Sequence, residues 1–307
     1  MSITVEYDRD ADADVHLYEE LYAGLPVPAP DLTREDLDRP AAVAVARRPD
    51  GELLGWAEVH DHDDRTADAQ WLLVSRERER ISTGRAVRRA ATDEDLETVV
   101  RLLRGAANSA AAAGRTALEW DGSGDGLDAR IAAELGAEES EELGRRWTTT
   151  APLADWRPQQ DLPPVTVRPV PGKPDARLLA EHARFYSDVT GQPYTPEDAA
   201  EVHADLPPLP QATLDLLTPA GDVAAQATAV ILDETAHVDV IFRSQAADTE
   251  AAVLTAFVAE LVALLRREHP GAGTLEVQEH GDPVTAEALA AAGLCVTDRW
   301  CRYRMGL

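Results

Sequence analysis

Short apolar runs alternate with turn residues along this chain, and longer amphipathic stretches separate them. Residues 41–46 and 213–217 are such runs, and each is followed by a glycine-containing turn and a second run. Paired runs around a glycine turn predict β-hairpins. Residues 93–113 and 249–268 are longer and end in turn residues, and they predict one long helix in each half of the chain.

The two hairpins belong to an internal repeat. The segment from Pro49 through Gly51 to Val59 matches the segment from Pro219 through Gly221 to Val230. Each half has the predicted order β-α-α-β-β-β-α-β-α-β, in a unit of about 150 residues. The other predicted strands cover residues 3–7, 67–74, 116–120 and 144–150 in the first half and 165–170, 236–242, 274–278 and 298–305 in the second, and the short helices cover 127–135 and 285–292.

The chain length and a proline-bearing segment both favour two domains. A chain of 307 residues exceeds the usual size of one domain. Residues 151–164 include four prolines and few side chains that could pack, which is typical of a linker. We therefore expect domains at residues 1–155 and 161–307.

The order of the elements, the hairpin turn and the glycines that end the short helices, Gly136 and Gly293, resemble the GNAT acetyltransferase superfamily in both halves. The resemblance implies an α/β fold of the α+β type, with two tandem GNAT-like domains. Each would be a mostly antiparallel mixed sheet flanked by helices. In this family the strand after the hairpin splays from its neighbour, and acyl-CoA lies in the cleft, where backbone N–H groups and a helix N-terminus meet the pyrophosphate.

The family's phosphate loop, Arg/Gln-x-x-Gly-x-Gly/Ala, has degenerate matches in both halves. In the first half Ile81 occupies the Arg/Gln position, whereas Gly84 and Ala86 fit the pattern. In the second half Arg243 fits, but Asp248 puts a negative charge where a phosphate would bind. The resemblance assigns acetyl-CoA binding, as co-substrate, to Arg80, Ser82, Thr83, Gly84, Arg85 and Ala86.

The two loops differ in their local charge. Residues 76–89 contain six arginines and two glutamates, whereas residues 233–250 contain one arginine and five acidic residues. Arginine binds phosphate oxygens in charge-assisted hydrogen bonds. The first half is therefore the expected acetyl-CoA site. The alternative is that the alternating Arg and Glu residues form a solvated charged ribbon.

Acyl transfer to an amine needs a base for the ammonium proton and an acid for the departing thiolate. The family's acid is often a tyrosine in the last helix, but residues 127–135 and 285–292 contain none. Glu58 and His60 are the expected catalytic residues, since they lie two apart on one strand and should share a face of the sheet. The alternative is that they are ordinary polar residues of a strand surface.

The second half has weaker candidates of the same kind. His237 and Asp239 are possible bases there, and Glu119 and Glu276 occupy matching places in the two repeats. Aromatic residues with two histidines fall in the helical region that shapes the acceptor pocket in GNAT proteins: Phe185, Tyr186, Tyr194, His182 and His203. Core packing is the alternative interpretation of the aromatic pair.

Charge and composition limit the kinds of molecule that the protein is expected to bind. A formal net charge of -27 disfavours nucleic acids and anionic membranes. No apolar stretch approaches the roughly 18–20 residues of a membrane span, and no signal peptide is visible. Cys295 and Cys301 are expected to be reduced thiols of a cytoplasmic protein, with no metal site. The cluster from His60 to Asp64 is expected to be a solvated loop.

Two functional hypotheses remain open. The first is an acyl-CoA-dependent N-acyltransferase that acts on a small amine by direct attack on the thioester, as a monomeric pseudo-dimer or a homodimer. The second is a non-catalytic GNAT-like protein that binds a ligand or a partner protein, which the degenerate loops and the missing tyrosine support.

Overall fold

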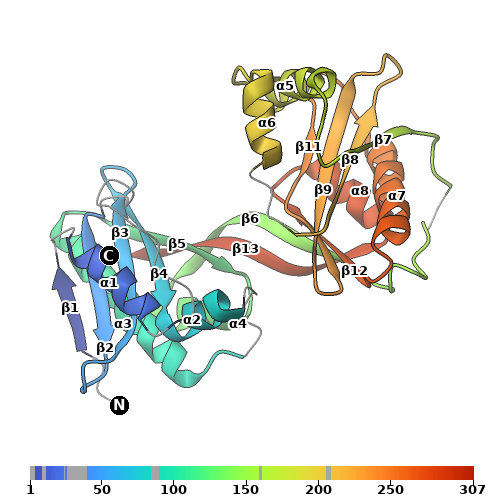
Figure 1. Ribbon diagram of the computed structural model, residues 1–307. Helices are drawn as coiled ribbons and strands as arrows, with labels where there is room; N and C mark the ends of the chain where they lie inside the picture. The colour runs from blue at the N-terminus through green and yellow to red at the C-terminus, as the bar shows by residue number, and fades with distance from the viewer. Residues whose placement is uncertain are drawn as a thin grey trace. The chain divides into compact units, whose positions relative to one another are not determined.

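The computed structural model describes residues 4–8, 12–23, 25, 40–83, 90–158, 161–204 and 209–307. The chain forms two compact units (Figure 1). Unit 1 comprises Met1–Glu142 and Trp300–Leu307, and unit 2 comprises Leu143–Arg299. The last residues of the chain therefore belong to the first unit, whereas the expected boundaries placed them in the second domain.

Unit 1 has the strand order β1-β2-β3-β4-β5-β13-β6. Its elements are β1 (Thr4–Asp8), α1 (Asp12–Tyr22), β2 (Ala42–Arg47), β3 (Leu53–Asp61), β4 (Thr66–Leu73), α2 (Val74–Thr83), α3 (Asp93–Ala112), β5 (Ala117–Ser123), α4 (Gly126–Leu135), the start of β6 (Glu138–Thr149) and the end of β13 (Leu294–Gly306). Strands β4 and β5 are parallel, and the pairs β1–β2, β2–β3, β3–β4 and β5–β13 are antiparallel.

Unit 2 repeats this arrangement. Besides the end of β6 and the start of β13, it contains β7 (Thr166–Val170), α5 (Ala176–Thr190), α6 (Pro196–Ala204), β8 (Gln211–Leu217), β9 (Val223–Leu232), β10 (Thr235–Val238), β11 (Ile241–Arg243), α7 (Ala251–Glu268), β12 (Thr274–Glu279) and α8 (Pro283–Ala291). Strands β10 and β12 are parallel, whereas β7–β8, β8–β9, β9–β10, β9–β11 and β6–β12 are antiparallel. The predicted mixed, mostly antiparallel fold is confirmed.

The hairpins show that the repeat is structural as well as sequential. Gly51 and Gly221 have φ angles of 92° and 90°, in the left-handed region that L side chains rarely adopt. The β2–β3 pairing shifts register between Ala46 and Arg47, and the β8–β9 pairing shifts at the matching place. Equivalent positions in the two units can therefore be compared residue by residue.

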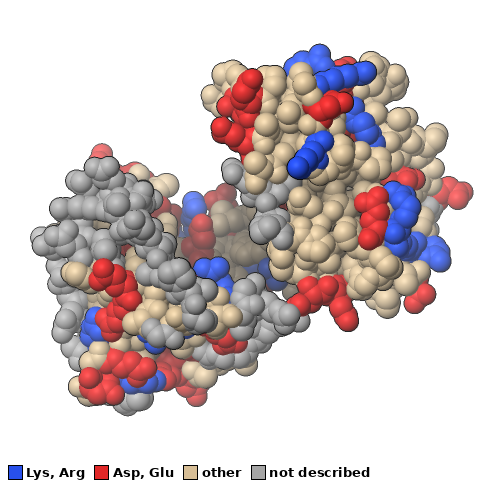
Figure 2. Space-filling view, viewed as in Figure 1, with Lys and Arg blue, Asp and Glu red and all other residues tan. Residues whose placement is uncertain are grey.

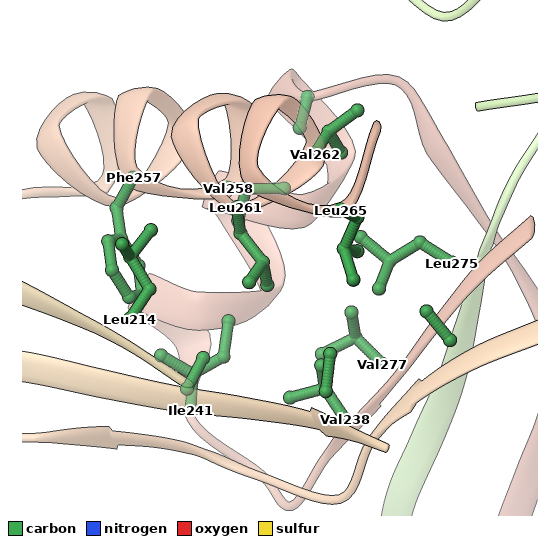
Figure 3. Packing of buried hydrophobic residues seen from close by; sticks show 14 of the residues in the cluster. Leu214, Val238, Ile241, Phe257, Val258, Leu261, Val262, Leu265, Leu275 and Val277 are labelled. Atoms are coloured by element: carbon green, nitrogen blue, oxygen red, sulfur yellow. The ribbon is translucent and has the colours of Figure 1, made fainter. Parts of the chain in front are cut away.

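The core of unit 2 lies between α7 and its sheet (Figure 3). Phe257, Val258 and Leu261 on α7 are fully buried and point toward strand residues such as Leu214 and Val277. Helices α5 and α6 form a separate cluster with the turn end of the hairpin, Leu217 of β8 and Val223 of β9, and side chains of α5 also contact Asp215 of β8 and Gln226 of β9. Each strand of this hairpin is therefore covered on both faces.

The proline-bearing segment after β6 packs against unit 2. Leu153 and Trp156 are 1% and 5% exposed, and Arg266 donates hydrogen bonds to the backbone carbonyl oxygens of both. The expected linker therefore contributes to the core of unit 2 over these residues, because its two large apolar side chains are buried in that cluster.

Charged side chains of both signs lie near one another on the face drawn in Figure 2. Several arginines are held by carboxylates within one unit, such as Arg302 by Asp121 in unit 1 and Arg243 by Asp282 in unit 2. Within the described part of the chain, no helix combines the length and apolarity that crossing a bilayer requires.

Candidate functional site

The parallel strands of each unit diverge after a short stretch of pairing. In unit 1 the pairing of β4 with β5 ends at Asp68 and Glu119, although β4 continues to Leu73 and β5 to Ser123. In unit 2, β10 pairs with β12 and ends at Val238, after which β11 pairs with β9. Diverging parallel strands leave backbone N–H and C=O groups available to a ligand.

Glu58 and His60 lie beside this divergence in unit 1. His60 is the cross-strand partner of Asp68, the last β4 residue paired with β5. The Glu58 Oε2 atom is 3.5 Å from His60 Nε2, and their side chains are 19% and 22% exposed. Trp56 Nε1 donates a hydrogen bond of 3.0 Å to Glu58 Oε1. The structure thus brings together the two residues that the sequence singled out.

Both side chains lie on the face of the sheet that carries α1. Trp56, two residues before Glu58, packs against Leu17 and Leu21 of α1, whereas Val59 belongs to the cluster on the opposite face with α3. The separation of 3.5 Å is longer than a well-formed hydrogen bond. His60 Nε2 is buried beside Glu58 Oε2 and makes no well-formed hydrogen bond with any described residue.

The expected phosphate-binding residues begin in a helix. Arg80, Ser82 and Thr83 lie in the last turns of α2, and Gly84, Arg85 and Ala86 fall outside the described residues. Arg80 pairs with Glu77 on the same helix but remains 58% exposed. A glutamate three residues earlier forms this pair locally, so Arg80 keeps the reach to bind another anion.

Other arginines of α2 are held by the protein. Arg78 donates to the carbonyl oxygens of Glu20 and Leu21 at 2.7 and 2.8 Å, and Arg76 lies 3.5 Å from Asp95. Asp95 also closes a capping box with Thr92 at the start of α3. At the start of α3, the N–H groups of Thr92 and Asp95 are thus bonded to each other's side chains.

The equivalent loop of unit 2 is engaged by a carboxylate. Asp188 of α5 accepts hydrogen bonds from Ser244 Oγ at 2.5 Å and from the Ala246 N–H at 3.3 Å. These donors lower the pKa of Asp188 from its ordinary value. Arg243, the position that fitted the family pattern, makes two hydrogen bonds of 2.7 and 2.9 Å to Asp282.

The two candidate bases of the second half, His237 and Asp239, lie apart from each other. His237 Nδ1 is 3.1 Å from Glu276 Oε2, at the end of the parallel pairing, and the two side chains are 31% and 27% exposed. Asp239 lies in the exposed bend between β10 and β11. In unit 1, Glu119 instead pairs with Arg304, so the matching glutamates have different partners.

The histidines and aspartates after β3 are held in a turn. His62 Nδ1 is 3.0 Å from Asp68, and Asp63 accepts from the backbone N–H groups of Arg65 and Thr66. Within the described ranges, no three His, Cys, Asp or Glu residues are grouped as a metal site.

Several solved structures share this fold over nearly the whole chain. A tandem GNAT protein from the clavulanic acid biosynthesis pathway is 17% identical, with a TM-score of 0.52 over 99% of this chain and 98% of its own. A GCN5-related N-acetyltransferase from Sphaerobacter thermophilus is 14% identical, with a TM-score of 0.52 over 99% and 95%. A GNAT-family acetyltransferase from Colwellia psychrerythraea is 13% identical, with a TM-score of 0.52 over 98% and 99%.

The chain has the tandem GNAT fold. No protein-family model and no curated protein matches its sequence. At these identities the likeness concerns the fold, so the chemistry of the tandem GNAT chain must be argued from its own residues.

The GNAT fold of unit 2 contains a buried polar cluster that the sequence did not reveal. Asp215 on β8 and His182 on α5 are both fully buried, and His182 Nε2 is 3.0 Å from Asp215 Oδ2. Arg168 on β7 and Gln226 on β9 also donate to Asp215, at shortest distances of 2.8 and 2.9 Å. The histidine was visible in the sequence, but alternation along β8 could not show that Asp215 faces it.

Burial raises the pKa of Asp215, but hydrogen bonds from His182, Gln226 and Arg168 outweigh it and hold the pKa below its ordinary value. A lowered pKa in the folded state stabilises the protein above the unfolded pKa of about 3.9, and this contribution disappears as the pH falls through the folded pKa. We expect Asp215→Asn to lower the free energy of unfolding by about 1.5–3 kcal/mol at neutral pH for each hydrogen bond to the ionised carboxylate that is lost, although Arg168 keeps its pair with Glu181.

The measurement is denaturant unfolding of both proteins from pH 7 to pH 3. The difference between wild type and Asp215→Asn should shrink as the pH falls. Glu287→Gln changes an exposed carboxylate on α8 and should stay within about 0.5 kcal/mol of wild type throughout. A pH-independent difference for Asp215→Asn would contradict the assignment of this carboxylate as ionised.

Proposed function

We propose that this protein is an acyl-CoA-dependent N-acyltransferase whose active site lies in unit 1, with acetyl-CoA as the acyl donor and a small amine as the acceptor. The observation that carries the proposal is the Glu58–His60 pair directly across from the end of the β4–β5 pairing. The GNAT fold of the neighbours supports it at the level of reaction class. The net charge of -27 favours a cationic amine, because the protein's field attracts it.

In the proposed reaction the acceptor's ammonium group loses a proton to Glu58 or to His60. The free amine nitrogen then attacks the thioester carbonyl carbon, and a C–N bond forms. The C–S bond breaks as the tetrahedral intermediate collapses, the thiolate of CoA leaves, and the second N–H proton passes from the amide nitrogen to the thiolate, directly or through water. A thiolate with a pKa of about 8.5 is a tolerable leaving group, so a tyrosine acid is not essential.

The alternative function is a non-catalytic binding protein with the same fold. The observation that favours it is that protein carboxylates already accept hydrogen bonds from groups that could bind an anion. Examples are Asp188 at the loop of unit 2 and Asp95 at the start of α3. Such contacts oppose phosphate binding at these two places.

Amine-dependent release of free thiol from acetyl-CoA separates the two functions. Incubation with acetyl-CoA and a panel of primary amines and polyamines should release thiol only when an accepted amine is present. Calorimetric binding of acetyl-CoA without thiol release from any amine would support the binding protein and contradict the enzyme.

We expect the double variant Arg80→Ala/Arg85→Ala to weaken acetyl-CoA binding, by about 1.5–3 kcal/mol for each charge-assisted hydrogen bond to phosphate that it removes. The affinity of the wild type should also fall with added salt, since exposed charges are screened. Calorimetry at two salt concentrations measures both effects. Arg243→Ala is the matched control and should change the affinity little, because Asp282 already holds Arg243. The reverse result would place the phosphate site in unit 2.

A further inference from the structure

The helix α6, which lies beside α5, is attached to unit 2 by few side chains (Figure 1). It has nine residues, all of them described, and Ala199 is the one that is buried. Ala199 belongs to the cluster that contains Ala183 and Tyr186 of α5. His203, four residues later, lies on the same side of α6 and also meets α5. A helix this short is not stable alone in water, so α6 depends on its packing against α5.

The contact of His203 with α5 is a hydrogen bond between two histidines. His203 Nε2 is 2.8 Å from His182 Nδ1, a distance that fits one N–H group and one acceptor nitrogen. One proton between the two nitrogens satisfies this bond, whichever ring it belongs to and whether the pair is neutral or carries one positive charge. When both rings are protonated, two N–H groups face each other and the bond is lost.

His182 is the fixed partner of this pair. It is fully buried, its Nε2 atom is 3.0 Å from Asp215 Oδ2, and the amide nitrogen of Gln226 is 3.3 Å away. His203 is only partly buried. While α6 stays in place, a broken bond leaves a buried polar group of His182 unsatisfied, which costs more than the bond itself contributes. Breaking the bond therefore favours release of α6.

The fold of unit 2 does not require this polar cluster. The matching bulges align Asp215 with Val45 of β2, and Gln226 with Trp56 of β3. Val45 and Trp56 are buried in a hydrophobic cluster of unit 1. The same arrangement of strands thus forms with an apolar pair, and burying a carboxylate instead carries a cost that the fold alone does not explain.

The surroundings make the attached His203 a poorer proton acceptor than a histidine in water. Burial and the neighbouring His182 lower the pKa of His203, and the negative charge of Asp215 opposes them. Arg168 pairs with Asp215 and balances part of that charge. On a released α6, the imidazole would be in water, where the ordinary histidine pKa is about 6.5. Release of α6 is therefore coupled to proton uptake.

The remaining titratable groups near the pair keep one form between about pH 5.5 and pH 7.5. Tyr186 OH donates to Gln226, and burial raises the pKa of Tyr186 to about 12. Hydrogen bonds from Arg168 lower the pKa of Glu181, which lies on the other side of that guanidinium. The carboxylates of α6 itself are Glu197, Asp198 and Glu201. Carboxylates ordinarily titrate near pH 4, so the histidines are the groups that change charge in this range.

We propose that the His182–His203 contact is a pH-sensitive switch, which holds α6 on α5 at neutral pH and releases it in acid. Above about pH 6.5 the contact contributes its full stabilisation, because neither attached nor released His203 is protonated. As the pH falls, released His203 binds a proton first, and the attachment weakens until the pH reaches the lower pKa of the attached form. One such proton changes the equilibrium by up to about tenfold per pH unit. The switch needs no substrate and does not rest on the proposed function.

Hydrogen exchange of the full chain, mapped by peptide, tests the switch. Exchange rates are divided by the intrinsic rate at each pH, which gives a protection factor for each helix. The protection of α6 should be constant above about pH 6.5 and should fall by up to about tenfold per pH unit below it. The core helix α7 should keep its protection throughout. Constant protection of α6, or an equal fall in α7, would overturn the proposal.

Two variants identify the histidine that responds. In His203→Gln the amide can donate to or accept from His182 Nδ1 but does not titrate, so α6 should stay protected over the whole pH range. His16→Gln is the matched control, since it removes a histidine of unit 1 whose side chain is 77% exposed, and it should keep the pH dependence of the wild type. A fall in His203→Gln as steep as in the wild type would exclude His203 as the sensor.

An NMR titration of the imidazole signals gives a measurement that depends on no variant. The pKa of His203 in the wild-type protein should lie below about 6.5, because burial and His182 disfavour its charged form. A pKa at or above this value would mean that protonation does not oppose the attachment of α6, and it would overturn the proposal even if His203→Gln failed to fold.

Discussion

Replacing Glu58 by glutamine should lower the rate of acyl transfer about 100-fold or more, while the affinity for acetyl-CoA stays nearly unchanged. Glutamine keeps the size of the side chain and can still accept the Trp56 hydrogen bond, but it cannot take up the ammonium proton. The measurement is steady-state thiol release with an accepted amine, together with calorimetry for acetyl-CoA. A large decrease in affinity would instead indicate a binding role for Glu58.

Two further variants test whether the effect is specific to the Glu58–His60 pair. His62→Gln changes a half-exposed histidine that pairs with Asp68 outside the Glu58–His60 contact, and it should keep the rate within about twofold of wild type. If Glu58→Gln and His60→Ala both retain the full rate, the catalytic centre lies elsewhere, and the His237–Glu276 pair of unit 2 becomes the place to test.

Cutting the chain between residues 155 and 161 should leave neither piece able to fold alone. Residues 1–155 lack the end of β13, which pairs with β5 from Trp300 to Gly306. Cys301 and Tyr303 of this strand are buried, and Tyr303 stacks on Trp120 at 5.7 Å. Without β13 the fragment exposes the edge of β5 and part of its core.

The fragment 161–307 lacks a larger part of its core. Trp147, Leu153 and Trp156 belong to the hydrophobic cluster of unit 2, and all three lie outside this fragment. Each large buried side chain removed costs about 3–5 kcal/mol, and removing three is comparable with a typical total stability of about 5–15 kcal/mol. Amide NMR spectra and thermal unfolding of each piece measure the outcome.

Mixing the two pieces should restore part of the cooperative unfolding, because together they contain every strand and, of the three large core residues, lack only Trp156. The fragment Leu143–Arg299 keeps the three large residues and is the control expected to fold by itself. Dispersed spectra and cooperative unfolding from both 1–155 and 161–307 alone would show that each half can replace its missing strand from its own sequence.

Local sequence determined the repeated parts of this protein. The glycine turns at Gly51 and Gly221 need a positive φ, and the flanking apolar runs specify strands, so both hairpins were predictable. Glu58 and His60 were predictable as neighbours for a similar reason: residues two apart on a strand share a face, whatever the rest of the fold does.

The helix α2 shows where local pattern was misleading. Residues 76–80 alternate Arg and Glu and were expected to lead into a phosphate loop, yet residues 74–83 form a helix before Gly84. Ion pairs three residues apart, such as Glu77 with Arg80, support a helix as well as they support a charged ribbon.

Only the tertiary structure decided which strand completes each unit and what lies beneath α5. The strands β6 and β13 end the two repeats with similar patterns, so either could pair with β5, and nothing in the sequence pattern chooses between them. Likewise Asp215 lies 33 residues from His182 and 47 from Arg168 along the chain. Their cluster exists because packing fixes which face of β8 meets α5, and burial then requires every polar group there to find a partner.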